Sequence, residues 1–210
     1  MQSLEKRTIG IDFDNTIVSY NELIYSVARQ RGLISSGVIK NKKEIRDAIR
    51  KLPNGETEWQ RLQAFIYGKG MESAVLMEGV GAFFDFCKGF NIPTFIISHK
   101  TQFASMDVER VDLHETALQW MKMNKFFSKE GFGLALENVY FEPTRQKKID
   151  RIQALGCTQF IDDLEETFLE DFFPDHVKKI LFSPQGTSIN VKDALIFRSW
   201  DQINDYLLGD

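Results

Sequence analysis

Two aspartates stand two positions apart near the start of the sequence, Asp12 and Asp14, and Thr16 follows them at the same spacing. Residues two apart on an extended chain point the same way, so both carboxylates can face one site. Carboxylates this close repel one another unless a cation lies between them or one holds a proton. The pattern indicates a nucleophile and a general acid/base beside a metal ion. The competing interpretation is a polar strand end whose aspartates cap the next helix.

A serine and a pair of lysines stand where two further elements end or begin. Ser98 directly follows the apolar run at 93–97, and its hydroxyl could hydrogen-bond a phosphate oxygen. Lys147 and Lys148 open a segment with helical spacing, where a lysine could neutralise a carboxylate and a phosphoryl oxygen together. Lys148 is preferred because Ile149 follows it directly and further apolar residues come at helical spacing. Taken singly, Ser98 is more often an ordinary residue at the end of a strand, and the two lysines are more often a solvated pair on a helix surface.

A second acidic pair, Asp162 and Asp163, ends the apolar segment at 158–161. Adjacent acidic residues after an apolar strand are unfavourable without a ligand, and their hard oxygen atoms suit Mg²⁺. A solvated loop or a helix cap is the alternative. His99 and Lys100, which follow the serine, could line the same site, although a surface position suits a histidine equally well.

Strands and helices alternate along most of the chain. The predicted strands span residues 8–13, 93–98, 138–141, 158–161, 179–182 and 194–197. The predicted helices between and after them span residues 80–88, 114–123, 147–155 and 200–208. This alternation predicts an α/β fold with a Rossmann-like parallel sheet and right-handed crossovers. In such sheets ligands bind outside the carboxyl ends of the strands, where the acidic pairs and the serine stand.

A helical stretch interrupts this alternation after the first strand. Its predicted helices span residues 17–31, 41–52 and 57–67, with Asn41 as a cap of the second, and no good strand candidate occurs before about residue 74. We therefore expect a core domain made of residues 1–16 and 78–210, and a helical cap made of residues 17–77.

The composition is that of an ordinary globular protein. The 210 residues are 43% hydrophobic and 27% charged. A net charge of −4 argues against nucleic acid as the main partner, since such binders usually carry a basic surface. We expect neither a signal peptide nor a membrane span, because no apolar run is long enough. Cys87 and Cys157 stand far apart in apolar contexts, which predicts two reduced core thiols and a cytoplasmic location.

The order of the chemical signals is acid pair, hydroxyl, lysine and acid pair, and in this the sequence resembles the haloacid dehalogenase-like (HAD) hydrolase superfamily. The resemblance rests on IDFDNT at 11–16, FIIS at 95–98, a lysine at 147–148 and FIDD at 160–163. It covers nearly the whole chain. It implies a Rossmann-like core with a small helical cap, Mg²⁺ as cofactor and a small phosphorylated substrate.

The resemblance also implies roles for the residues of the first motif. Asp12 matches the nucleophile, which forms an aspartyl-phosphate. Asp14 matches the general acid/base, and its backbone carbonyl matches a metal ligand. Thr16 matches the residue that supports this loop.

For the later motifs the resemblance implies binding roles. Ser98 matches the phosphate-binding hydroxyl, and Lys148 matches the charge-balancing lysine. Asp162 matches an acidic metal ligand, with Asp163 helping directly or through water. The stretch between this lysine and the second acid pair is shorter than is usual in the superfamily.

The sequence thus leads us to expect a Mg²⁺-dependent phosphatase acting on a phosphate monoester. A phosphomutase would use the same motifs, and a non-catalytic phospho-ligand-binding protein could share the scaffold. Hydrolytic dehalogenation fits less well, because Asp14 supplies the acid/base that phosphate esters need. The identity of the substrate cannot be read from these residues.

Overall fold

The computed structural model describes residues 7–186 and 191–209, and the chain forms two compact units. The first unit consists of Met1–Ile17, Leu76–Lys100 and Asn124–Asp210. The second consists of Val18–Val75 and Thr101–Met123. The sequence-based division assigned residues 101–123 to the core, whereas by their contacts they belong to the second unit.

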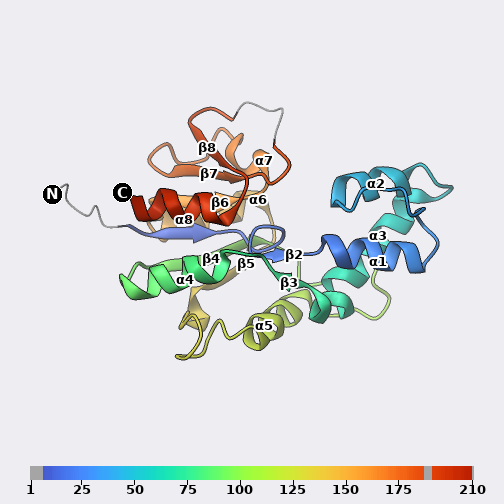
Figure 1. Cartoon of the computed structure of the whole chain (residues 1–210), viewed down its shortest axis with the longest axis horizontal. Helices are drawn as coiled ribbons and strands as arrows, with labels where there is room; N and C mark the ends of the chain where they lie inside the picture. The colour runs from blue at the N-terminus through green and yellow to red at the C-terminus, as the bar shows by residue number, and fades with distance from the viewer. Residues whose placement is uncertain (1–6, 187–190, 210) are drawn as a thin grey trace. The chain divides into compact units, whose positions relative to one another are not determined.

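A parallel sheet of six strands forms the centre of the first unit, in the order β5-β4-β1-β6-β7-β8. The strands are β1 (Ile9–Ile11), β4 (Thr94–His99), β5 (Val139–Glu142), β6 (Gln159–Asp162), β7 (Lys178–Phe182) and β8 (Ala194–Phe197). Every neighbouring pair in this sheet is parallel. The predicted α/β class and Rossmann-like sheet are therefore confirmed, and Figure 1 labels the strands in place.

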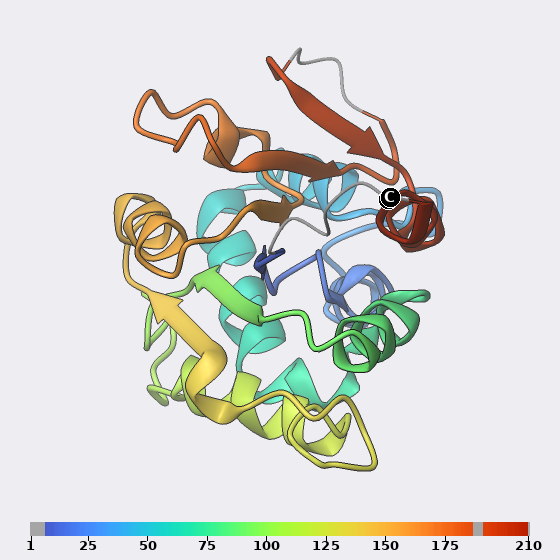
Figure 2. The ribbon, with the colours of Figure 1, turned by 90° about the vertical axis from the view of Figure 1, so that its left-hand side faces the viewer.

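Helices cover both faces of this sheet, as Figure 2 shows. On one face lie α4 (Val80–Gly89) and α8 (Trp200–Gly209), which meet where Phe83 and Trp200 approach to 5.2 Å between ring centroids. On the other lies α6 (Arg145–Ala154), whose Ile152 joins Ile97 and Phe160 in one buried cluster. The unit also contains the short α7 (Glu165–Phe168) and the 3₁₀ turn η2 (Leu136–Asn138).

The second unit is mainly helical. Its elements are β2 (Val18–Ser19), α1 (Asn21–Gln30), α2 (Lys42–Arg50), α3 (Gly55–Tyr67), the 3₁₀ turn η1 (Lys69–Ser73) and α5 (Leu113–Met123). The predicted cap of α2 is confirmed, since the Asn41 side chain accepts the backbone N–H of Glu44. α1 begins at Asn21 rather than at Ile17, because β2 comes first and pairs with β3 (Val75–Leu76). These two-residue strands were missed because they are too short to show an alternating pattern.

Both cysteines, Cys87 and Cys157, are free and buried, as expected of core thiols. Over residues 7–186 and 191–209, the helices lack the length and apolar character needed to cross a membrane.

Candidate active site

The loop after β1 carries the first acidic pair. β1 lies between β4 and β6, and its Ile11 is fully buried. The backbone N–H of Asp12 donates to the carbonyl of Ile161 at 2.8 Å, which continues the sheet pairing one residue beyond the strand. The chain then turns through Asn15, whose φ of 62° is left-handed and is better tolerated by asparagine than by most residues. The sheet therefore fixes the backbone of Asp12, and Asp14 forms a β-bridge just before this turn.

Lys148 lies between the two acidic pairs. Its Nζ is 2.7 Å from Asp12 Oδ1 and 2.7 Å from Asp162 Oδ2, and its side chain is 1% exposed. α6 presents Lys148 there because Thr144 caps the helix and Lys148 shares the buried face with Ile152, four residues on. The structure therefore joins a lysine from a helix to aspartates that follow two different strands.

Lys147, the other candidate lysine, lies in solvent. Its side chain is 62% exposed, and Asp150 on the same helix is its ion-pair partner at 3.5 Å. Lys148 is thus the member of the pair that contacts Asp12 and Asp162.

Burial governs the electrostatics of this cluster. Burial, together with the charges of Asp162 and Asp14, raises the pKa of Asp12 to about 6, although the charge of Lys148 lowers it. Burial also acts to lower the pKa of Lys148, but the carboxylates of Asp12 and Asp162 outweigh it and the pKa is raised. Asp12 and Asp162 share the single ammonium of Lys148, so these three groups carry a net negative charge when both carboxylates are ionised.

Three aspartates offer oxygen atoms for a metal ion. Carboxylate oxygens of Asp12, Asp162 and Asp163 lie within 4.8 Å of one another. Asp162 is fully buried, and its Oδ1 accepts the backbone N–H of Leu164 at 3.0 Å, which fixes its orientation. Hard oxygen donors with uncompensated negative charge suit Mg²⁺, which binds through few carboxylates and keeps several waters. The residues present fit such an ion, while ligation by the Asp14 carbonyl stays a prediction.

Thr16 ties the two acidic segments together. Its Oγ1 accepts the backbone N–H of Asp163 at 3.1 Å and donates to Asp163 Oδ1 at 3.3 Å. Its carbonyl accepts the indole N–H of Trp200 at 2.8 Å. Because Thr16 is fully buried, these bonds hold the loop after β1 against the loop after β6.

Ser98 reaches the same edge from β4. β4 pairs directly with β1, and the register places Ile96 opposite Ile11, so Ser98 lies just beyond the end of β1. Ser98 is 1% exposed. His99, the last residue of the strand, is exposed. The three strand ends that carry Asp12, Ser98 and Asp162 are therefore parallel neighbours, as the sequence predicted.

Asp14 has a lysine partner of its own. The Nζ of Lys100 donates to Asp14 Oδ2 at 2.7 Å, and the lysine side chain is 4% exposed. The sequence suggested only that Lys100 could line the site, since nothing in it marks a partner 86 residues away. Of the first acidic pair, Asp12 is thus bonded to Lys148 and Asp14 to Lys100.

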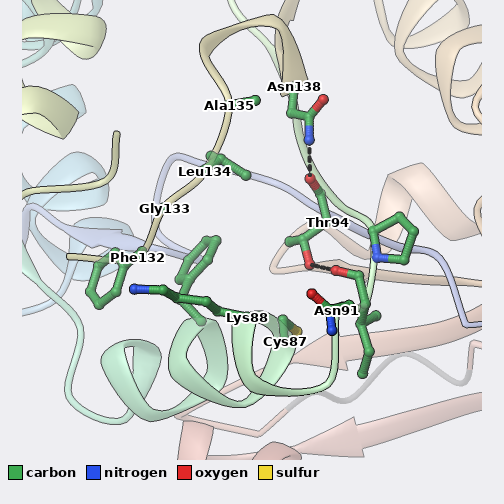
Figure 3. A pocket seen from close by; sticks show the side chains of 12 residues that line it. Cys87, Lys88, Asn91, Thr94, Phe132, Gly133, Leu134, Ala135 and Asn138 are labelled. Atoms are coloured by element: carbon green, nitrogen blue, oxygen red, sulfur yellow. Dashed lines mark hydrogen bonds between the residues drawn. The ribbon is translucent and has the colours of Figure 1, made fainter. Parts of the chain in front are cut away.

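A separate cavity of about 310 Å³ lies at the opposite, amino end of β4 (Figure 3). It lies between the carboxyl end of α4 and the segment that precedes β5. Of its lining side chains Lys88 alone carries a charge, and its ammonium already donates to the carbonyls of Lys129 and Gly131. None of the predicted site residues lines this cavity, so the candidate active site is the cluster at the carboxyl edge.

Solved structures share the fold of this chain. A haloacid dehalogenase-like family hydrolase from Streptococcus pneumoniae matches with a TM-score of 0.64 and 16% identity, over 96% of this chain and 98% of that one. A HAD family hydrolase from Deinococcus radiodurans, solved with bound phosphate and sodium, matches with a TM-score of 0.54 and 12% identity, over 96% and 95%. The chain has the haloacid dehalogenase-like fold.

A further matching structure names a different chemistry. A structure described as a dehalogenase matches with a TM-score of 0.57 and 13% identity, over 98% of both chains. No protein-family profile and no curated protein sequence matches this chain. The matching structures are described both as hydrolases and as a dehalogenase, so the reaction has to be inferred from the site.

Proposed function

We propose that this protein is a Mg²⁺-dependent hydrolase of the HAD superfamily that cleaves a phosphate monoester through an aspartyl-phosphate on Asp12. The observation that carries the proposal is the buried cluster in which Lys148 bridges Asp12 and Asp162, with Asp163 beside them. An anionic nucleophile and an anionic phosphate repel each other, so the reaction needs positive charge at this place. One lysine and one cation site supply it.

In the first step a carboxylate oxygen of Asp12 attacks phosphorus, and the bond from phosphorus to the leaving oxygen breaks. Asp14 gives its proton to that oxygen, so the product leaves as a neutral alcohol. Lys148 stays bonded to Asp12 and keeps it directed toward the phosphate. Ser98 donates its hydroxyl hydrogen to a phosphoryl oxygen.

In the second step Asp14, now a carboxylate, takes a proton from water. The resulting hydroxide attacks phosphorus, the acyl-phosphate bond breaks, and Asp12 and inorganic phosphate are released. The proton on Asp14 restores the starting state. Mg²⁺, held by Asp12, Asp162 and Asp163, would neutralise charge on the phosphoryl oxygens in both steps.

Hydrolytic dehalogenation is the second candidate, because a structure described as a dehalogenase has the same fold. A carboxylate at Asp12 could displace halide from carbon. Halide leaves as a stable anion without a proton, so that reaction needs neither an acid at Asp14 nor a metal cluster. The acidic cluster around Asp162 and Asp163 therefore favours the phosphate ester. A phosphomutase would share the first step. The role of the helical unit as a cap stays a prediction, and so does a cytoplasmic location.

A panel assay tests the proposal. The purified chain is incubated with Mg²⁺ and sugar phosphates, nucleotides, phospho-amino acids and p-nitrophenyl phosphate, and phosphate release is measured. Parallel samples with haloacids are assayed for halide release. We expect phosphate release that EDTA abolishes and added Mg²⁺ restores. Activity that survives thorough chelation, or halide release without phosphate release, contradicts the proposal.

A matched pair of variants tests the metal cluster. Asp163→Asn should raise the Mg²⁺ concentration for half-maximal activity by about 10- to 100-fold, as loss of a supporting metal contact commonly does. Asp150→Asn removes an exposed carboxylate from α6 and should leave that concentration unchanged. An equal response of the two variants would exclude Asp163 from the metal site.

A further inference from the structure

Lys100 is a buried charge that the reaction described above does not use. It directly follows β4, and its backbone N–H donates to the carbonyl of Glu142 at 3.0 Å, which extends the pairing of β4 with β5. Its side chain is 4% exposed, and its ammonium lies 2.7 Å from Asp14 Oδ2. The ammonium also lies 5.8 Å from the ring centroid of Phe13, which is fully buried. The backbone of Lys100 is thus held by sheet pairing. Its ammonium is held between Asp14 and the ring of Phe13, both in the loop after β1.

Stability alone does not account for a charge at this place. A buried ion pair contributes little net stability, because desolvation of both groups offsets their attraction, and apolar side chains of similar size commonly do as well. A methionine would fill the same volume as Lys100 without that cost. The charge is therefore explained better by an effect on Asp14 than by a contribution to packing.

The two partners differ in how far their side chains are buried. Lys100 extends a strand in the sheet through its backbone N–H, and Asp14 forms a β-bridge just before Asn15, where the chain turns with a left-handed φ. Asp14 is also the more exposed partner, at 20% against 4%. A buried lysine bonded to this more exposed carboxylate restricts the directions in which the carboxylate can point.

We infer that Lys100 is a positioning residue for Asp14, which rests on the proposed function. Because an ammonium donates and does not accept, Asp14 Oδ2 stays an acceptor and the transferable proton belongs to Oδ1. Lys100 therefore selects the oxygen that protonates the leaving group in the first step and takes the proton from water in the second. A fixed acid matters for esters of aliphatic alcohols, such as sugar phosphates, whose alkoxides leave poorly without a proton. The substrate class that this arrangement serves is the alkyl phosphate monoester.

Leaving-group dependence separates this role from others. Wild type and Lys100→Met are compared on p-nitrophenyl phosphate, which needs little protonation, and on the best alkyl phosphate of the panel, both with saturating Mg²⁺. Lys100→Met should lower kcat/KM on the alkyl ester by about 100-fold, the lower end of what general acid catalysis contributes. The pre-steady-state burst of p-nitrophenol should keep a rate within about threefold of wild type, followed by slow turnover because activation of water is impaired.

Two further variants serve as controls for Lys100→Met. Lys147→Met, which removes an exposed lysine of α6, should behave as wild type on both esters. Lys100→Arg retains the charge and should recover part of the loss on the alkyl ester; it also provides a folded variant if the methionine protein does not fold. An equal loss on both esters with a raised KM would mean that Lys100 binds phosphate directly, and that overturns the inference, as does no loss at all.

The inference and the proposed function fail in different ways. A wild-type protein that releases no phosphate from any ester with Mg²⁺ refutes the proposed function, and the role of Lys100 falls with it. An active wild type whose Lys100→Met variant keeps the same leaving-group dependence refutes the role of Lys100 alone.

Discussion

Replacing Lys148 by methionine tests the charge balance of the acidic cluster most directly. The substitution keeps the length of a side chain that is 1% exposed and removes the ammonium that lies 2.7 Å from both Asp12 and Asp162. Two buried carboxylates then face each other without compensation. Removing one partner of a buried ion pair costs about 3–5 kcal/mol of unfolding free energy.

The size of the thermal shift follows from the size of the chain. For about 150–250 residues, 1 kcal/mol changes Tm by about 2–4 °C. Lys148→Met should therefore lower Tm by about 6–20 °C in EDTA. Because Mg²⁺ brings positive charge to the same carboxylates, it should raise the Tm of this variant more than that of wild type.

The assay is a thermal melt of wild type and variants with EDTA and with excess Mg²⁺. Lys147→Met is the matched control, because it removes the neighbouring lysine from the exposed face of the same helix. It should change the unfolding free energy by less than about 0.5 kcal/mol. If Lys148→Met and wild type have the same Tm in EDTA, the lysine does not compensate the charge of the buried carboxylates and the reasoning is wrong.

Three further predictions concern the acid pair and the thiols. Asp12→Asn should lower turnover by about 10⁴-fold or more without a product burst, because an amide is a weak nucleophile; full turnover would remove Asp12 from that role. Asp14→Asn should retain a burst with p-nitrophenyl phosphate and then stall, whereas undiminished steady turnover would contradict its role as base. Burial raises the pKa of Cys87 to about 11 and that of Cys157 to about 12. A thiol reagent at pH 8 should therefore label neither in the native protein and both in denaturant, and labelling of the native protein would contradict this.

The acidic ends of the strands could be predicted from sequence because they follow local patterns. Asp12 and Asp162 each end a short apolar run, and Ser98 comes near the end of another. Alternating strands and helices require right-handed crossovers, which bring such ends to one edge of a parallel sheet. The preference for Lys148 over Lys147 came from helical periodicity, which is also local.

Long-range partners could not be predicted in this way. The Lys100–Asp14 bond joins residues 86 apart, and a lysine after a strand looks the same in sequence whether it meets solvent or a carboxylate. The place of residues 101–123 in the second unit is likewise set by contacts and not by their own pattern.

Sequence by itself thus determined the α/β class, the sheet edge that gathers the acids, and the identity of the acidic pairs. Only the tertiary structure decided how the charges pair, with Lys148 between Asp12 and Asp162 and Lys100 on Asp14. The physical reason is the range of the interactions involved. The periodicity of apolar residues depends on residues close together in the sequence. A buried ion pair depends on desolvation and on distances that are set only after the sheet has formed.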